Sequence, residues 1–170
     1  MALSVLIEGA ARSDANSQPA QDNQRPGRDA FGDLCPVDSR WADNDVYGHI
    51  NNVMYYSYFD STINRYLIDE GGLDIHNGEV IAYVVSSGCD YFEAAAYPDA
   101  LTIGLRVDKL GHSSVRYGLA WFGEETAGGT GTAKALGFVV HVCVDRDSGR
   151  PVSIPAPLRK ALAALQSSPE

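Results

Sequence analysis

The chain has 170 residues, a length typical of a single domain with a substantial apolar core. Its 22 acidic and 13 basic residues give a formal net charge of −9 at pH 7, which argues against nucleic acid as a general partner. An anionic small molecule is not excluded, because its recognition needs only a local basic patch. No run of about 20 apolar residues occurs, so no membrane-spanning segment is predicted.

Two features favour a cytoplasmic protein. The three cysteines, Cys35, Cys89 and Cys143, lie far apart and form no C-x-x-C pair, which is typical of reduced thiols. The short apolar stretch of residues 3–7 has no basic residues before it and is interrupted by Glu8, so it does not resemble a signal peptide.

Residues 1–33 differ in composition from the rest of the chain. After the brief apolar start they are rich in polar residues, alanine, proline and glycine. Such a segment cannot bury enough apolar surface to fold by itself, so we predict a disordered N-terminal arm. The folded domain is predicted over residues 34–165, with a weak first strand over residues 35–42.

The densest pattern in the chain spans residues 40–67 and reads RWADNDVYGHINNVMYYSYFDSTINRYL. Its second half carries apolar and aromatic side chains at helical spacing, on one continuous face. Asn51 and Asn52 supply candidate N-caps, and Gly71-Gly72 supplies a stop signal. The pattern therefore predicts a helix over residues 52–69 whose aromatic face is buried against a sheet.

The loop before this helix has the composition of a reactive site. Asp43 and Asp45 share one side of the chain if the segment is extended, and two close carboxylates raise the pKa of at least one of them. The start of a helix presents unpaired N–H groups and a partial positive charge, which can stabilise an oxyanion. The alternative is that both aspartates cap local amides and that the asparagine pair only starts the helix.

The remaining sequence predicts antiparallel strands and a short final helix. The strands are expected over residues 80–92, 101–108, 114–121 and 132–144, with a Gly-rich connection over residues 124–131 and the helix over residues 155–165. One long buried helix beside a run of strands indicates an α+β architecture. A sheet covered by a single helix leaves edges and apolar surface exposed, so oligomerisation is expected.

The residues of this loop and helix resemble a known family. The run D-x-D-x-x-G-H-x-N-N-x-x-Y, followed by F-D-S-T-I-N-R-Y-L, is similar to the 4-hydroxybenzoyl-CoA thioesterase family of acyl-CoA thioester hydrolases. The segments LGHSSVRY at 110–117 and HVCVDRDSGRPVSIP at 141–155 agree with it. The resemblance covers about residues 34–162. It implies a hotdog fold, in which an antiparallel sheet of about five strands wraps a long central helix. It also implies a homodimer or homotetramer with the active site at the dimer interface.

The resemblance also implies roles for residues of the loop. Asp45 matches the catalytic carboxylate, which either attacks the thioester carbonyl or activates a water. The oxyanion would be stabilised by a backbone N–H of Asn52 or a neighbour. His49 tunes Asp45 or acts as a base, or else it is a turn residue that bonds to backbone. Asn51 orients substrate or water, or else it caps the helix.

Further residues are expected at the substrate. They are Tyr55 and Tyr58 for the acyl group, and His112, Ser113, Ser114 and Arg116 for the coenzyme A nucleotide. Core packing explains the two tyrosines equally well. A solvated hairpin with no role in binding explains the turn at 112–114 equally well.

The predicted activity is hydrolysis of an acyl-CoA to a carboxylic acid and free coenzyme A. No metal and no redox cofactor are expected. Coenzyme A takes part only as a portion of the substrate. Two alternatives remain at this stage. One is a hotdog hydratase or dehydratase acting on an acyl thioester, and the other is a non-catalytic domain that binds acyl-CoA.

Overall fold

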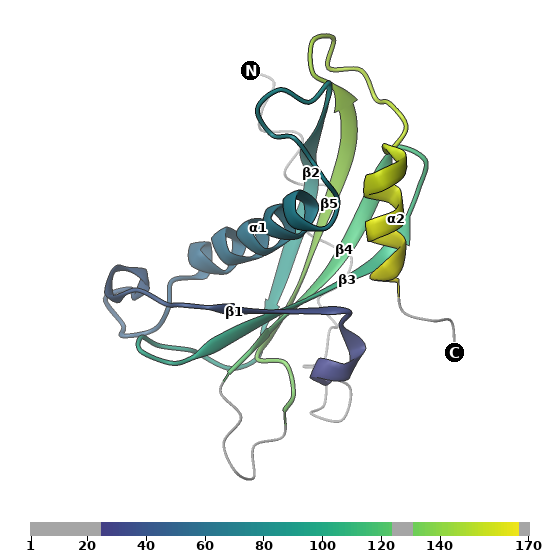
Figure 1. Ribbon diagram of the computed structural model, residues 1–170. Coiled ribbons are helices and arrows are strands. Elements are labelled where there is room, and N and C mark those ends of the chain that lie inside the picture. Colours follow the sequence, from purple (N-terminus) through teal and green to yellow (C-terminus); the bar gives the residue numbers. More distant parts are fainter. Residues whose placement is uncertain (1–24, 124–130, 167–170) are drawn as a thin grey trace, which may run out of the picture.

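The computed structural model describes residues 25–123 and 131–166. Its elements in chain order are η2 (Arg28–Ala30), β1 (Asp33–Val37), η3 (Trp41–Asp43), α1 (Asn52–Asp69), β2 (Val80–Tyr91), β3 (Leu101–Leu110), β4 (Ser114–Phe122), β5 (Ala135–Asp145) and α2 (Ala156–Ala164). The five strands form one antiparallel sheet in the order β1-β3-β4-β5-β2, and α1 lies across one face of it (Figure 1). This arrangement confirms the predicted α+β architecture.

Helix α1 has the bounds that its sequence pattern predicts. The side chain of Asn51 caps its start by accepting a hydrogen bond from the Val53 N–H at 3.1 Å. Past its end, Gly72 adopts a φ of +65°, which glycine allows at low cost. Its buried residues are Tyr55, Tyr58, Phe59, Thr62, Ile63, Tyr66 and Leu67. They form one stripe that faces the sheet and builds most of the core from the helix side.

The helix approaches the sheet closely at one point. A Cβ atom on Gly137 of β5 would lie only 2.4 Å from Cε2 of Phe59, so a glycine is needed to seat this ring. Phe59 is fully buried, and burial of such a side chain stabilises a fold by about 1.5–3 kcal/mol. This contact fixes the height of α1 above the sheet.

The strand order differs from the order along the chain. Strand β2 does not pair with β3, which follows it, but with β5, over the register Val80↔Asp145 to Tyr91↔Ala135. Consequently β2 forms one edge of the sheet and β1 forms the other. Three consecutive residues in the middle of β2 are exposed: Tyr83, Val84 and Val85 at 51%, 53% and 59%. Such an apolar edge is a surface for pairing with another chain.

The first strand differs from its prediction. Strand β1 begins at Asp33 and ends at Val37, and the residues that follow turn into the short helix η3 instead of continuing the strand. Pro36 is tolerated because β1 is an edge strand and pairs only with β3. Strand β5 begins at Ala135, three residues later than its predicted start at 132. The predicted connection at 124–131 lies outside the described residues except for Gly131.

Residues 25–33, which composition assigns to the N-terminal arm, contact the sheet. Phe31 is buried and packs edge-on against Phe122, with ring centroids 5.6 Å apart. Arg25 donates a hydrogen bond to Glu93 at 2.9 Å. The rest of the predicted arm, residues 1–24, lies outside the described residues. Within the described part of the chain, no helix is both long and apolar enough to cross a membrane.

Candidate active site

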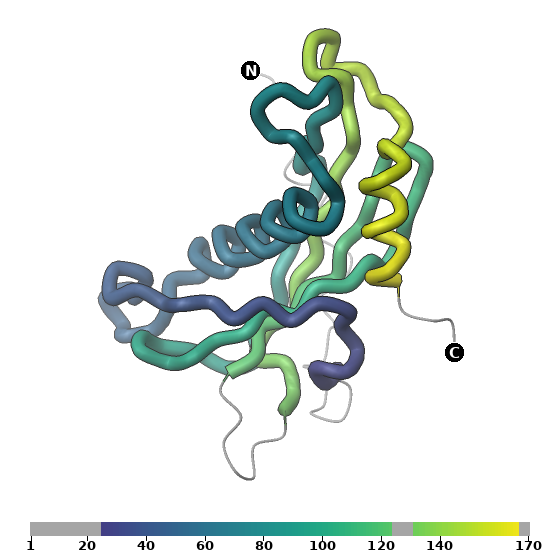
Figure 2. The backbone as a smooth tube through the Cα atoms, in the orientation of Figure 1, coloured from purple at the N-terminus to yellow at the C-terminus, as the bar shows by residue number. Residues whose placement is uncertain are grey.

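Residues 40–51 form a closed turn that leads directly into α1. The Asn51 N–H donates to the carbonyl of Asp43 at 2.8 Å, and the Asp45 N–H donates to the carbonyl of His49 at 2.8 Å. Gly48 completes the reversal with a φ of +84°, a conformation that disfavours other residues. The chain therefore runs out and back like a small hairpin, visible at the far left of Figure 2, and returns as the first turn of α1. We call residues 40–51 the Asp45 hairpin.

Asp45 lies half-buried within this hairpin. Its Oδ1 accepts hydrogen bonds from the N–H groups of Tyr47 at 2.8 Å and His49 at 3.4 Å. Within residues 25–123 and 131–166, its Oδ2 has no hydrogen-bond partner. One carboxylate oxygen therefore holds the turn, as the capping alternative expected, and the other is available for chemistry. The imidazole of His49 is exposed, and only its backbone contributes to the turn.

The start of α1 leaves one backbone donor available. The Val53 N–H donates to Asn51 Oδ1, and the Met54 N–H donates to the Asn51 carbonyl at 2.8 Å. Among the described residues, the N–H of Asn52 has no such partner. An unpaired N–H at the positive end of a helix dipole can stabilise a negatively charged oxygen. Asn51 thus acts as a cap, and Asn52 carries the free donor.

The carboxylate and the free donor line the same depression. It has a volume of about 370 Å³ and is bounded by Asp45, His49, Ile50, Asn52, Tyr55, Tyr91, Phe92, Glu93 and Ala94. One wall is aromatic: the Tyr55 ring lies between Trp121, at a centroid distance of 4.1 Å, and Tyr91, at 5.0 Å. The pKa of Tyr55 is raised, chiefly by burial, so its hydroxyl stays neutral. The depression therefore combines a carboxylate, a helix N-terminus and apolar walls.

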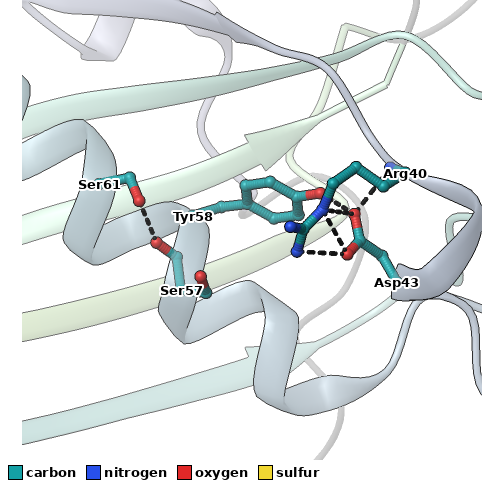
Figure 3. A network of polar contacts seen from close by, with 5 residues as sticks. All are labelled: Arg40, Asp43, Ser57, Tyr58 and Ser61. Carbon is teal, nitrogen blue, oxygen red and sulfur yellow. Dashed lines mark hydrogen bonds and ion pairs between the residues drawn. The ribbon is translucent and has the colours of Figure 1, made fainter.

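Asp43 does not share this depression with Asp45. It is 1% exposed and points into the protein, where it accepts hydrogen bonds from Arg40 and from the Tyr58 hydroxyl (Figure 3). Burial raises the pKa of Asp43, but the hydrogen bonds from Arg40 and Tyr58 outweigh it, and the pKa is lowered. The expected pair of close carboxylates, with one raised pKa, is therefore wrong for Asp43. Asp43 is the last residue of η3, and its side chain bonds back to Arg40, the residue that precedes this short helix.

The other expected substrate residues lie apart from Asp45. Tyr58 is 9% exposed, its hydroxyl bonds to Asp43, and it does not line the depression. The turn that carries His112 and Ser113 lies beside α2, where Arg159 donates to the His112 carbonyl at 2.9 Å. Ser114 begins β4, and Trp121, which stacks on Tyr55, lies about 23 Å farther along the same strand at ~3.3 Å per residue. The turn at 112–114 is therefore far from the wall of the depression.

Arg116 projects from the opposite face of the sheet to α1. Its guanidinium lies 3.8 Å from the ring centroid of Phe138 and 3.9 Å from the Asp108 carboxylate. It lines a separate shallow depression together with Arg106 and Gly118. In one protomer, therefore, neither Arg116 nor the turn at 112–114 meets the Asp45 hairpin.

Comparison with known proteins identifies the family. Residues 39–162, which include the Asp45 hairpin, α1 and most of α2, match the model of the thioesterase-like superfamily. The chain belongs to this superfamily. The uncharacterized protein YsmA of Bacillus subtilis (strain 168) is 29% identical over 124 residues, which are 73% of this chain and 80% of that protein.

Solved structures agree with this assignment. The PA5185 protein of Pseudomonas aeruginosa is 55% identical, covers 86% of this chain and 99% of its own, and superposes with a TM-score of 0.81. A thioesterase from Thermus thermophilus, solved with coenzyme A and zinc, is 27% identical and covers 78% of this chain and 98% of its own, with a TM-score of 0.63. The fold of this thioesterase-like protein is thus the predicted hotdog fold. In the described part of the chain no three His, Cys, Asp or Glu side chains gather as metal ligands.

Local sequence patterns do not indicate much of the wall of the depression. Tyr91 and Phe92 follow Asp45 by more than 40 residues, and they reach it because β2 ends beside the start of α1. The sequence predicts the strand that carries them, but no local signal indicates which element its end will face. Ile50 differs from these two residues because it is close to Asp45 in the sequence, next to the asparagine pair. It is buried, and its N–H donates to the Ala95 carbonyl.

Proposed function

We propose that this thioesterase-like protein hydrolyses acyl-CoA thioesters to a carboxylic acid and free coenzyme A. The observation that carries the proposal is the common depression, which is lined both by Asp45, whose Oδ2 is unpaired among the described residues, and by Asn52, whose N–H is unpaired there. Membership of the thioesterase-like superfamily supports it, as does the similarity to a thioesterase solved with coenzyme A.

The chemistry follows from the two groups. In one route, Asp45 Oδ2 attacks the thioester carbonyl, forms a mixed anhydride and expels the thiolate of coenzyme A, and water then hydrolyses the anhydride. In the other, Asp45 removes a proton from a water that adds to the carbonyl, and collapse of the intermediate expels the thiol. In both routes the carbonyl oxygen becomes negative. The Asn52 N–H and the helix dipole stabilise that charge, an effect worth about 10²–10³ in rate for one donor in other enzymes.

The depression suits the acyl part of the substrate better than the nucleotide part. Its lining includes the rings of Tyr55, Tyr91 and Phe92. It also includes the carboxylate of Asp45 and that of Glu93, which is paired with Arg25, and among the described residues it includes no lysine or arginine. Phosphate groups would be repelled there, whereas an apolar acyl group would be surrounded by apolar walls. The phosphates of coenzyme A must therefore bind elsewhere.

A second copy of the chain offers a place for them. The exposed apolar residues Tyr83 to Val85 lie in the edge strand β2, whose far end supplies Tyr91 to the depression. We propose that two protomers associate along this edge, as a homodimer or as half of a homotetramer. Association would cover the edge and close the depression, and it would allow the turn at 112–114 or Arg116 of another protomer to reach the nucleotide.

The test is release of free thiol from a panel of acyl-CoAs with short, long and aromatic acyl groups. Wild type is compared with Asp45→Asn, which keeps the size of the side chain and the acceptor for the hairpin amides. We expect wild type to release thiol and the folded variant to lose at least about 10²-fold in kcat. If wild type binds acyl-CoA and leaves it intact, the non-catalytic binding domain is the correct function. If it instead adds or removes water at the acyl chain and releases no thiol, the hydratase alternative is correct.

A further inference from the structure

We propose that Arg40, Asp43 and Tyr58 form a positioning network that holds Asp45 in place at the start of α1. None of the three lines the depression, so they act through Asp45 and do not touch the substrate. The inference rests on the proposed thioesterase function and deepens it. It assigns Tyr58, expected from the sequence to contact the acyl group, to a different task.

The centre of the network is a buried and fully bonded carboxylate. Asp43 Oδ1 accepts hydrogen bonds from Arg40 Nε at 3.0 Å and Nη2 at 2.8 Å. Asp43 Oδ2 accepts one from the Arg40 backbone N–H at 2.7 Å and one from the Tyr58 hydroxyl (Figure 3). Hydrogen bonds to an ionised group are strong and directional, and a buried carboxylate that lacks them is costly. The position of Asp43 is therefore determined by Arg40 and Tyr58 together.

These bonds connect both ends of the Asp45 hairpin to the helix. Arg40 precedes the hairpin turn, and Tyr58 lies in the second turn of α1. Asp43 also receives the N–H of Asn51, the N-cap of α1, on its backbone carbonyl. Asp45 follows only two residues later, so its position relative to the Asn52 N–H depends on where Asp43 is held.

Little else supports the tip of the hairpin. Val46 and Tyr47 are 93% and 83% exposed, so the tip is not anchored by packing in the protomer. An isolated two-stranded turn is marginally stable in water. Its orientation must therefore come from its base, where the network lies together with a hydrogen bond from the Tyr97 N–H to Asn44 Oδ1 at 3.1 Å and one from the Ile50 N–H to the segment before β3.

The protonation states of the network are stable. The pKa of Tyr58 is raised to about 12, first by burial and then by Asp43, so its hydroxyl remains a donor. The lowered pKa of Asp43 keeps the carboxylate ionised. Figure 3 also draws Ser57 and Ser61, where the Ser61 hydroxyl donates to the Ser57 carbonyl at 2.8 Å within α1. Of the helix residues in that view, Tyr58 alone joins α1 to the hairpin.

Tyr58→Phe tests the proposal, because it removes one hydroxyl and leaves the ring against Trp121, 5.3 Å away. The matched control is Tyr66→Phe. Tyr66 lies on the same buried face two turns later, is 8% exposed, and donates its hydroxyl to the Ala161 carbonyl at 3.0 Å, far from the hairpin. Each variant removes one tyrosine hydroxyl donor from the same helix face, that of Tyr58 to a carboxylate and that of Tyr66 to a carbonyl, so a loss of stability alone should affect residues 40–51 no more than the rest of the described chain.

We expect Tyr58→Phe to lower kcat by about 10-fold to 100-fold with KM changed by less than about threefold, since a displacement of about 1 Å in a reacting group can cost 10²-fold. Tyr66→Phe should keep the kcat of wild type. The second readout is amide hydrogen exchange of residues 40–51, which should become faster in Tyr58→Phe and not in Tyr66→Phe.

The outcomes separate this inference from the proposed function. If wild type hydrolyses acyl-CoA and the two variants have the same kcat and the same exchange, the network does not position Asp45. If wild type hydrolyses none of the panel, the proposed function fails, and hydrogen exchange alone decides whether the network holds the hairpin. If Tyr58→Phe does not fold, Arg40→Gln replaces it. Arg40 is 68% exposed, so that change opens no cavity, and the same loss of kcat and faster exchange are expected.

Discussion

The contact between Phe59 and Gly137 gives the sharpest test of how the helix is seated on the sheet. In Gly137→Ala the new methyl group would lie 2.4, 3.0 and 3.1 Å from three carbon atoms of the Phe59 ring. Carbon atoms prefer about 3.5–4.0 Å, so the ring must move by about 1 Å in a site with no free space. Overpacking of this kind costs about 1–3 kcal/mol, while the stiffer unfolded chain returns about 0.4–1 kcal/mol. The net expected loss of unfolding free energy is about 1–2 kcal/mol.

The assay is urea unfolding at one fixed protomer concentration, since the proposed association would contribute to stability. Gly137→Ala is measured in the wild-type background and again with Phe59→Leu, which removes the ring. In the Phe59→Leu background the alanine should cost less than about 0.5 kcal/mol, so the double-mutant cycle should show a coupling of about 1 kcal/mol or more. An equal cost in both backgrounds would refute the reasoning, because it would mean that the ring does not rest on Gly137.

Two further predictions concern the sheet edge and the buried carboxylate. Val84→Lys places a charge in the exposed apolar edge of β2, and we expect it to raise the dissociation constant of the proposed dimer at least about tenfold, measured by analytical ultracentrifugation. Wild type that is monomeric at the same concentrations would contradict this. Burial raises the pKa of Asp43, but Arg40 and Tyr58 lower it further, so its stabilising effect is complete above the unfolded pKa of about 3.9 and is lost as pH falls through the lower folded value. The difference in unfolding free energy between wild type and Asp43→Asn should therefore shrink below about pH 4. A difference that stays constant from about pH 7 down to about pH 2 would show that Asp43 does not titrate with the fold.

The two aspartates of the D-x-D segment illustrate how neighbouring residues of one type can do different work. Asp43 is buried, bonded on both oxygens and held ionised, which suits a structural anchor. Asp45 keeps one oxygen unpaired among the described residues and lines a depression, which suits a reacting group. Each environment is set by the fold around the residue, since the two side chains have the same chemistry.

The sequence by itself determined the local features of this protein. The bounds of α1 and its buried face follow from side-chain periodicity and from Asn51 as a cap, all within one segment of the chain. The position of Asp45 before the helix start is likewise fixed by the few residues between them. These properties depend on near neighbours in the chain, whose geometry the peptide backbone restricts.

Only the tertiary structure decided which distant segments meet. The pairing of β2 with β5, the aromatic wall from Tyr91 and Phe92, and the separation of Arg116 from Asp45 all depend on strand order. The role of Asp43 depends on Tyr58, fifteen residues away and on another element. Strand pairing joins residues of any separation through similar backbone bonds, so a pattern of alternating side chains predicts each strand but not its neighbour.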